Sequence, residues 1–596
     1  MTAYKAPLAD MRFVMFDVLK LDAQYARIAG GENATRDTVE AILEEAARFS
    51  EQVLAPLNAI GDEQGCVLDK ATATVTTPRG FKEAYAKYVE GGWNGLTAPE
   101  AYGGQHLPES IGAPIKEMLD SANLSWGNFP LLSHGATEAL RLHGEEWQRE
   151  AFLKPIVEGR WTGTMCLTEP HCGSDLGLLK SKVEANPDGS YRVSGTKIFI
   201  TAGEHDLTEN IVHLVLARLP DAPPGVKGIS LFIVPKYKVD KSGKMGERNA
   251  VTCGAIEHKM GIKASVTCVM NFDGAEGHLI GQPNKGVNAM FTMMNTARLA
   301  VGIQGLGLIE RAYQGSLAYA RDRLQGRSLS GPKAPDKPAD PLIVHADIRR
   351  MLLTQKAFAE GGRVLGYYAA SLVDLVERAP DADERKRAEE LLSFIIPITK
   401  ALLTETANEC TYHAVQIFGG HGYIHESGME QLARDARITT IYEGTTGIQA
   451  LDLLGRKIMA TQGAGLKQFL EQISAFCHAN AQNPALAEFI APLAVAAKDW
   501  ADLTQEIGKR VVANPDEVGV AAVDYLFFSG YVALAYFWAR SVAAAEESAQ
   551  AIEFKQAKRS TARFYFLRVL PRTLSHAANL RAGADSLLAM PAAQFG

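Results

Sequence analysis

No run of 18 uninterrupted apolar residues occurs in this chain of 596 residues, so the sequence predicts no membrane-spanning helix. We expect no signal peptide, because Asp10, Arg12 and Asp17 interrupt the apolar residues of the first twenty positions. The seven cysteines form no C-x-x-C pair, which argues against a zinc site and against a disulfide framework. No G-x-G-x-x-G sequence marks a strand-to-helix junction, so a nicotinamide site is not indicated. These absences predict a protein of a reducing, cytoplasmic compartment without a metal centre.

The chain also lacks an excess of positive charge. Its formal net charge is -7 and its pI is about 6.1, whereas nucleic-acid-binding domains usually carry a basic excess. We therefore expect no nucleic-acid partner. With 47% apolar and 22% charged residues, the composition is that of a folded globular protein. At roughly 150 residues per domain, the length predicts three to five domains.

The spacing of apolar residues changes along the chain and predicts the domain boundaries. After an N-terminal extension, 1–35, helical spacing through Val39, Leu43 and Ala46 predicts an α domain over 36–160. Short β-branched runs separated by turn formers predict a β domain over 161–285. Helical spacing returns over 286–461, interrupted by the Gly/Pro/Lys-rich segment QGRSLSGPKAPDKPADP, and continues in a last helical block over 462–596.

Two segments of the predicted β domain could bind a planar or phosphorylated ligand. In CLTEPHCGSD, 166–175, glycine and hydroxyl residues follow an apparent strand, and their N–H and O–H groups could donate to a flavin edge or a phosphate. An ordinary capped turn explains the same residues. In KIFITAG, 197–203, Phe199 and Thr201 alternate and would lie on one strand face, where they could contact a flat cofactor or simply pack in a sheet.

Two later segments carry glycines and one carboxylate. QIFGGHGY, 416–423, ends a predicted helix, and its glycines could press against a ligand or cap the helix. In RITTIYEGTTGIQ, 437–449, Glu443 precedes a predicted helix. Its simplest role is to stabilise the helix N-terminus electrostatically, aided by a threonine cap.

The order and spacing of these four segments resemble the acyl-CoA dehydrogenase flavoprotein family, with a match from about residue 36 to 460. The N-terminal YKAPLADMRFVMFDVL and the last block resemble a long bacterial branch, which includes fatty acyl-CoA and 3-methylthiopropionyl-CoA dehydrogenases. The resemblance implies an α+β multidomain fold with an N-terminal α domain, a middle β-barrel-like domain, an α-helical bundle and an extra C-terminal helical domain.

The resemblance also implies a site with FAD as cofactor and acyl-CoA as substrate. Positions that bind FAD in the family match Leu167, Thr168, Gly173, Ser174, Phe199, Thr201, Arg323, Gln416, Gly420 and Thr445. Positions that contact the substrate match Ser174, Asn295, Arg298, Tyr442 and Gly444. Because Arg323, Gln416 and Gly420 match residues that reach the FAD of a neighbouring subunit, a homodimer or a dimer of dimers is implied.

Four positions depart from the common family pattern. Phe199 stands in place of a frequent Trp and keeps a flat ring without its N–H donor. Gly326 replaces a Phe, Asn295 replaces an Asp near the CoA chain, and Gly447 replaces a Gln after the catalytic loop. These changes weaken the expected contact set more than the expected chemistry.

The chemistry explains why a carboxylate and a flavin belong together. Dehydrogenation of a thioester across Cα and Cβ needs a base for the α-proton, which the resemblance assigns to Glu443, and a hydride acceptor, which a flavin supplies. We expect oxidation of acyl-CoA to trans-2-enoyl-CoA in fatty acid β-oxidation, with medium or long chains favoured and electrons passed to an electron-transfer flavoprotein.

Three other functions stay open on sequence grounds, as does the role of one basic segment. A 3-methylthiopropionyl-CoA dehydrogenase and an acyl-CoA oxidase would use the same carboxylate. A DNA-binding flavoprotein of the same superfamily would need a basic C-terminal domain, whereas residues 461–596 hold twelve basic and twelve acidic residues. Within them, segment 554–581 has seven basic residues and no acid, which indicates a solvated face or a peripheral membrane contact.

Overall fold

The computed structural model describes residues 3–596, without the side chains of Thr292 and Asn295, and divides the chain into two compact units. One unit, here the bundle unit, comprises 1–47, 109–121 and 301–596. The other, here the barrel unit, comprises 48–108 and 122–300. Helices α6 (Glu109–His143) and α9 (Gly286–Asp322) contribute to both.

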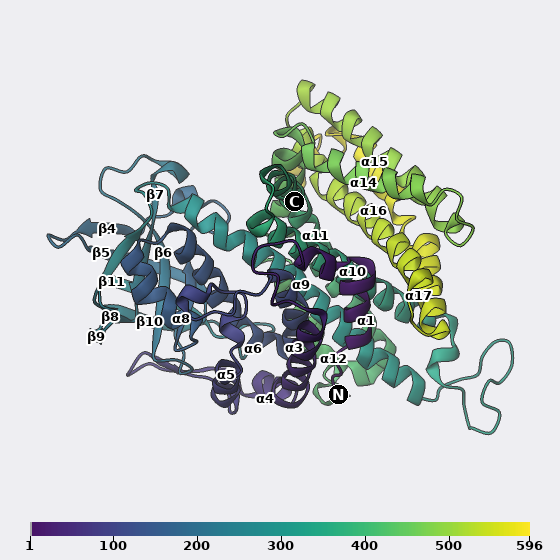
Figure 1. Ribbon diagram of the computed structural model, residues 1–596, viewed down its shortest axis with the longest axis horizontal. Helices are drawn as coiled ribbons and strands as arrows, with labels where there is room; N and C mark the ends of the chain where they lie inside the picture. Colours follow the sequence, from purple (N-terminus) through teal and green to yellow (C-terminus); the bar gives the residue numbers. More distant parts are fainter. Residues whose placement is uncertain (1–2) are drawn as a thin grey trace. The chain divides into compact units, whose positions relative to one another are not determined.

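The barrel unit combines short helices with one seven-stranded sheet (Figure 1). Its short helices are α4 (Leu57–Gln64), α5 (Phe81–Glu90), α7 (Glu146–Gln148) and α8 (Lys154–Val157). Its sheet contains β3 (Trp161–Cys166), β4 (Lys182–Ala185), β5 (Tyr191–Thr201), β6 (Asn210–Arg218), β7 (Ile229–Pro235), β10 (Val251–Ile256) and β11 (Thr267–Ile280). Two further hairpins are β1 (Val67–Asp69) with β2 (Thr74–Thr76), and β8 (Tyr237–Val239) with β9 (Met245–Arg248).

The strand pairings of the large sheet close on themselves. β5 pairs with β4 and β11, β4 and β7 both pair with β6, and β7 pairs back to β11. β6 and β7 are almost continuously apolar and buried, as expected for strands covered on both faces. A closed ring leaves few free strand edges, and the β-barrel-like domain expected from the sequence is confirmed.

The bundle unit is helical. Its helices outside the last block are α1 (Leu8–Arg12), α2 (Leu21–Tyr25), α3 (Arg36–Phe49), α10 (Ala346–Arg378), α11 (Ala382–Phe418), α12 (Met429–Thr439) and α13 (Thr446–Leu451). The last block contains α14 (Ala464–Ala479), α15 (Ala487–Ala513), α16 (Glu517–Glu547), α17 (Ile552–Phe564), α18 (Arg572–Ala582) and α19 (Asp585–Leu588), in green to yellow in Figure 1.

Helix α16 is the most apolar of these helices. By length and composition it could cross a membrane, although Asp524 and Arg540 limit its uncharged stretch to 525–539, which is shorter than 18 residues. However, 67% of its most apolar window is buried inside the protein. Its Gly530 lies against Leu402 of α11, and Trp538 donates to the carbonyl of Ala357 on α10. These contacts are typical of the core helix of a bundle.

The Gly/Pro/Lys-rich segment after α9 forms an ordered loop. The fully buried carboxylate of Asp340 accepts hydrogen bonds from the backbone N–H groups of Ser328, Lys333 and Ala334. The Arg327 guanidinium lies 3.3 Å from the same carboxylate. One aspartate therefore organises a segment whose composition predicts a linker.

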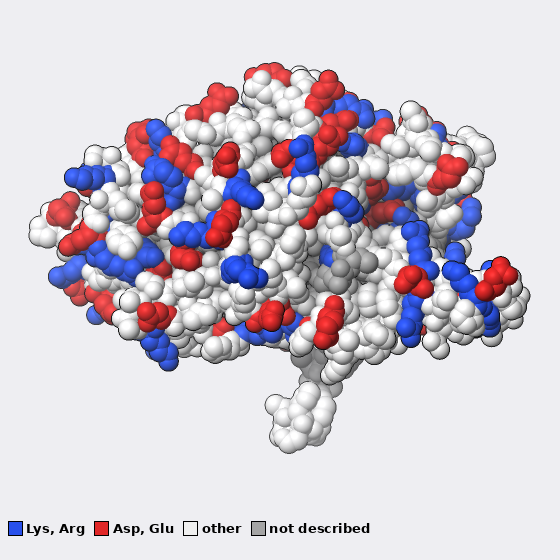
Figure 2. Space-filling view, turned by 90° about the horizontal axis from the view of Figure 1, so that it is seen from below, with Lys and Arg blue, Asp and Glu red and all other residues white. Residues whose placement is uncertain are grey.

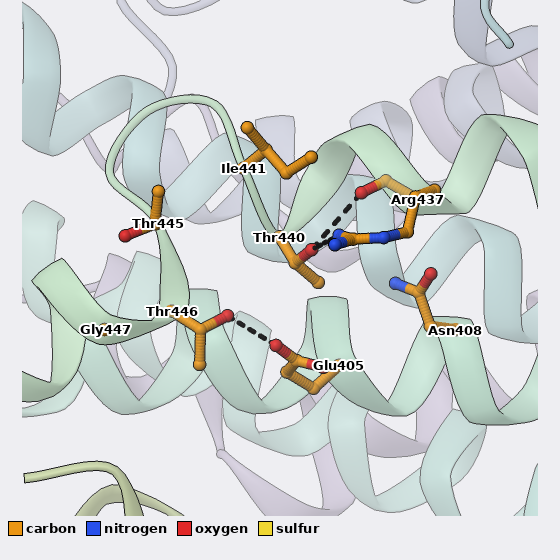
Figure 3. Close-up of a pocket in the computed structure, with 8 residues that line it drawn as sticks. All are labelled: Glu405, Asn408, Arg437, Thr440, Ile441, Thr445, Thr446 and Gly447. Carbon is orange, nitrogen blue, oxygen red and sulfur yellow. Dashed lines mark hydrogen bonds between the residues drawn. The ribbon is translucent and has the colours of Figure 1, made fainter. Parts of the chain in front are cut away.

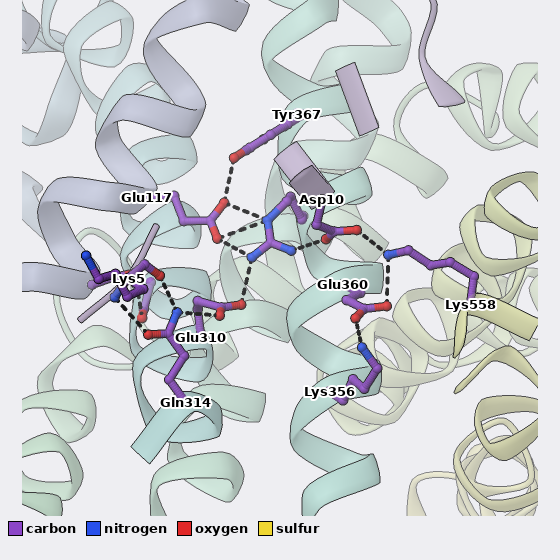
Figure 4. A network of polar contacts seen from close by, with 12 residues as sticks. Lys5, Asp10, Glu117, Glu310, Gln314, Lys356, Glu360, Tyr367 and Lys558 are labelled. Carbon is purple, nitrogen blue, oxygen red and sulfur yellow. Dashed lines mark hydrogen bonds and ion pairs between the residues drawn. The ribbon is translucent and has the colours of Figure 1, made fainter. Parts of the chain in front are cut away.

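A buried ion network joins the two ends of the bundle unit (Figure 4). The Arg363 guanidinium lies 2.6 Å from Glu117 and 2.8 Å from Glu310, and it also pairs with Asp10 in the N-terminal extension. Asp10 pairs in turn with Lys558 of α17. The Arg363 and Lys558 side chains are almost fully buried.

Most of the basic residues in segment 554–581 have acidic partners. Five of the seven form ion pairs: Lys558 with Asp10 and Glu360, Arg559 with Glu488 and Glu546, Arg563 with Glu488, Arg572 with Glu409 and Arg581 with Glu506. On the face shown in Figure 2, Lys and Arg are interspersed with Asp and Glu. The segment is thus more nearly neutral than its sequence suggests.

Candidate active site

The loop that follows β3 in the barrel unit is fastened to β5 by a buried lysine. The Lys197 ammonium donates to the carbonyl of Leu167 at 3.0 Å and lies 2.8 Å from the Glu169 carboxylate. Glu169 also accepts from the backbone N–H groups of Lys180 and Ser181. Burial opposes the charge on Glu169, yet the Lys197 ammonium and these donors hold its pKa at about 2.

Glu169 also belongs to a cluster with His171 and Cys172, whose ligand atoms lie within 4.8 Å of one another. The carboxylate is already engaged by an ammonium and two N–H groups, so a metal cation would have to displace Lys197. The cluster is better explained as support for the loop.

Phe199 interrupts β5 with a β-bulge. Ile200 pairs with Cys268 and Lys197 with Met270, so Ile198 and Phe199 together face the single residue Val269. Phe199 has a φ of 57°, in the left-handed region, where a non-glycine residue costs about 1–2 kcal/mol. Phe199 as a whole is 60% exposed. Strain combined with an exposed aromatic ring indicates a binding position rather than core packing.

The bulge also changes one expectation. Strict alternation predicted Phe199 and Thr201 on one face of a regular strand, but the extra residue breaks the alternation between Lys197 and Ile200. Thr201 resumes the pairing, opposite Thr267. In the preceding loop Leu167 and Thr168 are half-buried, and Gly173 and Ser174 are exposed. The carbonyl of Thr168 accepts from the N–H of Ile198, so the bulge and the loop are directly bonded.

The second candidate segment lies between α12 and α13 of the bundle unit. Glu443 has a φ of 54°, the same left-handed conformation as Phe199, and Gly444 follows with a φ of 90°. Thr445 then caps α13, because its hydroxyl accepts from the N–H of Ile448. The capping threonine expected from the sequence is therefore present at the start of the helix.

Buried side chains hold residues 440–446, which the sequence predicts to be the catalytic loop and which keep that name below. The Lys400 ammonium of α11 donates to the carbonyl of Gly444 at 2.8 Å, and the Gln449 amide donates to the carbonyl of Glu443 at 3.1 Å. The Tyr442 hydroxyl donates to Gln304 of α9 at 2.5 Å. Burial raises the pKa of Tyr442, and the nearby charges of Asp120 and Glu443 raise it further.

A pocket of ≈ 380 Å³ opens beside the catalytic loop (Figure 3). It is lined by Glu405, Asn408, Arg437, Thr440, Ile441, Thr445, Thr446 and Gly447. Glu405 accepts from the Thr446 hydroxyl, and Arg437 donates to the Thr440 hydroxyl, both at 2.5 Å. Polar side chains of α11, α12 and α13 thus surround the pocket, and glycine at 447 adds no side chain to it.

Ile441 does not behave as the sequence suggested. The apolar residues beside Glu443 in the sequence predict a buried environment for its carboxylate, but Ile441 is 46% exposed and lines the pocket. Tyr442 is half-buried and turns its hydroxyl toward Gln304.

The remaining predicted residues lie at element ends or inside helices. Arg323 directly follows α9, and Gln416 and Gly420 lie at the end of α11; all three are exposed. A side chain added at Gly420 would meet no atom within 4 Å. Arg298 in the barrel unit is buried. The side chain of Asn295 lies outside the described residues.

Sequence reasoning missed Lys197, Lys400 and Gln449. Lysine in a β run and in an apolar helix looks like an exposed residue in sequence, yet Lys197 and Lys400 are fully buried. The signal available was Lys400 in IIPITKALL, a single charge inside a long apolar stretch. A charge at such a position requires a partner.

Four family models match consecutive parts of the chain. They describe the N-terminal domain (36–160), the middle domain (164–275) and the C-terminal domain (284–459) of acyl-CoA dehydrogenases, and a C-terminal-like domain of an acetyl-CoA dehydrogenase (469–591). Together they cover both segments that carry the candidate site and the helical block after them.

Individual relatives match over nearly the whole chain. A 3-methylmercaptopropionyl-CoA dehydrogenase of Ruegeria pomeroyi is 42% identical over 98% of this chain and 99% of its own. A broad-specificity linear acyl-CoA dehydrogenase of Mycobacterium tuberculosis is 34% identical over 96% of both chains. The solved structure of an acyl-CoA dehydrogenase from Bacillus anthracis, complexed with FAD, covers 93% of this chain and 90% of its own, with a TM-score of 0.74 and 21% identity. At 21% identity, the similarity to this solved structure shows that the fold is shared and no more.

Proposed function

Because the chain belongs to the acyl-CoA dehydrogenase family, we propose that it oxidises a short thioether acyl-CoA, 3-methylthiopropionyl-CoA, to the corresponding 2-enoyl-CoA. The observation that supports this choice of substrate is the 42% identity with the Ruegeria pomeroyi enzyme over 98% of this chain. The thioether was the alternative on sequence grounds. The full-length match now favours it over the medium and long chains that the C-terminal block suggested.

The residues of both candidate segments suit FAD, the cofactor of this family. In the barrel unit, Phe199 exposes a flat ring on a strained backbone beside Thr168 and Thr201. In the bundle unit, Thr445 lines a polar pocket, and Gly420 leaves open space for a bulky ligand. When bound, FAD supplies an acceptor for the hydride from the β-carbon.

Glu443 is proposed as the base that takes the α-proton. A general base must be held within reach of the proton it abstracts, and a non-glycine residue kept at a φ of 54° by its neighbours is fixed in this way. The N–H of Glu443 would donate to the thioester carbonyl, which makes the α-proton more acidic. The base and the carbonyl donor then belong to one residue.

A second substrate class follows from the other curated relative. The Mycobacterium tuberculosis enzyme is described as acting on linear acyl-CoAs with broad specificity, and its match is also full-length. Straight-chain acyl-CoA oxidation in β-oxidation is therefore the alternative. Oxidase activity is a further alternative, which peroxide formation without an added electron acceptor would reveal.

The proposed enzyme has two protein partners. An electron-transfer flavoprotein would receive the electrons, and a second copy of the chain would contribute Arg323, Gln416 and Gly420 to the cofactor site. These three residues are exposed in the single chain, as a shared site requires.

The seven free thiols support a cytoplasmic location. Peripheral membrane contact through segment 554–581 would rest on Arg568 and Lys555, because the other basic residues have acidic partners.

Flavin bleaching under anaerobic conditions tests the proposal. The purified holoenzyme is mixed with 3-methylthiopropionyl-CoA and with a series of straight-chain acyl-CoAs from four to sixteen carbons. We expect the highest kcat/KM with the thioether. A clear preference for long chains would favour β-oxidation instead, and no bleaching by any acyl-CoA would contradict the family's activity for this chain.

A further inference from the structure

Two consecutive carbonyl groups of the catalytic loop are held by two buried side chains. The Gln449 amide donates to the carbonyl of Glu443, and the Lys400 ammonium donates to the carbonyl of Gly444. Both donors have no exposed surface. They come from different helices, since Lys400 lies on α11 and Gln449 on α13. The loop is therefore fixed from two directions.

These hydrogen bonds set the orientation of Glu443. A peptide group is planar, so holding its carbonyl oxygen fixes the plane of the whole group. Gln449 fixes the plane that joins Glu443 to Gly444, and Lys400 fixes the plane that joins Gly444 to Thr445. On the other side, the N–H of Tyr442 donates to the carbonyl of Ile438. That bond holds the peptide group that joins Ile441 to Tyr442, so the chain is anchored on both sides of Glu443.

The conformation held in this way is an unfavourable one. A glutamate rarely adopts a φ of 54° unless the surrounding structure imposes it, because its Cβ then crowds its own backbone. Glycine at 444, with a φ of 90°, provides the freedom for the turn but does not hold Glu443 in place. The two donors bond to the carbonyls on either side of this turn and so oppose relaxation of the loop.

Lys400 brings an ammonium group to the carbonyl of Gly444. An ammonium group loses much of its hydration in a buried site, and a neutral side chain of similar length would pack there without that cost. The ammonium supplies a charge-assisted hydrogen bond, which is stronger and shorter than a neutral one. This bond holds the carbonyl next to Glu443 more firmly than a neutral donor would.

We propose that Lys400 and Gln449 are positioning residues, which hold the backbone of Glu443 in the left-handed conformation that aims its carboxylate at the α-proton. Neither residue touches the reacting atoms. The proposal rests on the dehydrogenase function proposed above, because it assigns these two residues to the base of that reaction.

The test compares Lys400→Met with Thr399→Val in the holoenzyme. Methionine fills a similar volume and removes the donor. Thr399 is the neighbouring buried residue of α11, and its hydroxyl donates to Ile395, away from the loop, so valine removes a buried hydrogen bond of the same helix. We expect kcat of Lys400→Met to fall about 100-fold, the cost of a displaced reacting group, with KM changed less than about threefold. Thr399→Val should keep kcat within about threefold of wild type.

Three readouts separate positioning from general damage. FAD content and melting temperature report how much of the enzyme is intact. With substrate deuterated at the α-carbon, the isotope effect on kcat should rise in Lys400→Met, because proton abstraction becomes slower relative to other steps. A crystal structure of the variant should show Glu443 outside the left-handed region. A variant that loses activity only through partial unfolding would keep the wild-type isotope effect, and this outcome would overturn the proposal.

Two further outcomes decide whether Lys400 and Gln449 position Glu443. If kcat of Lys400→Met stays within about threefold of wild type, or falls equally in Thr399→Val, the proposal is wrong. Should Lys400→Met not fold, Gln449→Met removes the donor to the other carbonyl, and an unchanged kcat there would have the same meaning. Wild-type enzyme without dehydrogenase activity would instead contradict the function, and the φ of Glu443 in the variant would still test the geometry.

Discussion

The loop after β3 and the catalytic loop before α13 are both held by a buried lysine, but the other groups that hold them differ. The first loop is bonded to the bulge at Phe199, and the second contains Glu443; both residues have a left-handed backbone conformation. In each loop, a buried lysine donates to a backbone carbonyl. Lys197 also meets the carboxylate of Glu169, whereas Lys400 meets the catalytic loop through a neutral carbonyl. The first loop is held by an ion pair and its surrounding N–H groups, and the second by hydrogen bonds to the backbone.

The difference suits the roles proposed for the two loops. Glu169 belongs to the support of its loop, so its charge is used for stability. Glu443 is the residue proposed to accept a proton, and its loop is held through the backbone carbonyls of Glu443 and Gly444. Substitutions in the two loops should therefore affect different properties, stability in the barrel unit and catalysis in the bundle unit.

The largest effect is expected from Glu443→Gln. Glutamine keeps the size and the backbone of the residue but cannot take the α-proton, so kcat should fall by about 10³- to 10⁴-fold. FAD content, acyl-CoA affinity and melting temperature should stay close to wild type. Stopped-flow bleaching of the flavin band measures the first quantity, and calorimetry the others. A rate near that of wild type would place the base elsewhere.

Glu169→Gln should show the opposite pattern. It leaves the Lys197 ammonium buried without its carboxylate, and breaking a buried ion pair in this way costs about 3–5 kcal/mol of unfolding free energy. Denaturant unfolding followed by circular dichroism gives this value. The double variant Glu169→Gln/Lys197→Met should recover part of the loss, since no unpaired charge is then buried. If the single variant is as stable as wild type, the ion pair does not hold the loop.

The pH dependence of stability should also separate the two units. The pKa of Glu169 is lowered from 4.5 to about 2, so the stability it contributes is present above about pH 4.5 and is lost as the pH falls toward 2. Burial raises the pKa of Asp120 in the bundle unit from 3.8 to about 6, so Asp120 costs stability as the pH rises from about 4 through 6.

Melting temperatures measured from pH 3 to 8 for wild type, Glu169→Gln and Asp120→Asn test this contrast. Glu169→Gln should lose less stability than wild type on the acid side. Asp120→Asn should remove part of the decline between pH 4 and 6. Parallel curves for all three proteins would show that neither carboxyl group contributes as described.

The smallest effect concerns Phe199→Gly. Glycine adopts a φ of 57° without strain, so relief of about 1 kcal/mol should offset the loss of the exposed ring, and the melting temperature should change little. FAD affinity should fall, by up to about tenfold, because an aromatic contact contributes about 0.5–1.5 kcal/mol. Fluorescence titration of apoenzyme with FAD measures this. Phe199→Tyr, which keeps the ring, is the matched control and should bind FAD like wild type.

Much of the fold could be predicted from the sequence, because helices and strands differ in the period of their apolar residues. Helical spacing over 286–323, 343–377 and 385–417 predicts three helices, and α9, α10 and α11 begin and end within three residues of these limits. The β-branched runs in the middle of the chain form strands. The grouping of 48–108 with 122–300 could not be predicted, since it depends on contacts between distant segments. The order that Asp340 imposes on the Gly/Pro-rich segment depends on a single side chain.

The candidate site was predictable where chemistry determines residue type. Glu443 and the threonine cap at 445 follow from the motif, and the structure has Thr445 at the start of α13. The bulge at Phe199 was not predictable, because KIFIT has the same alternation as a regular strand. The buried lysines were missed for a related reason: composition shows that a charge is present, but only packing shows which carbonyl it meets.

The ion network of Figure 4 has a consequence for how such a chain can evolve. Asp10 of the N-terminal extension neutralises both Arg363 of the bundle and Lys558 of the C-terminal block. An ancestor that gained the block without the extension would have buried two cations and lacked one of their anions, at a cost of several kcal/mol. The two additions at opposite ends of the gene are therefore expected to be inherited together, and a relative with only one of them should carry compensating changes at 363 or 558.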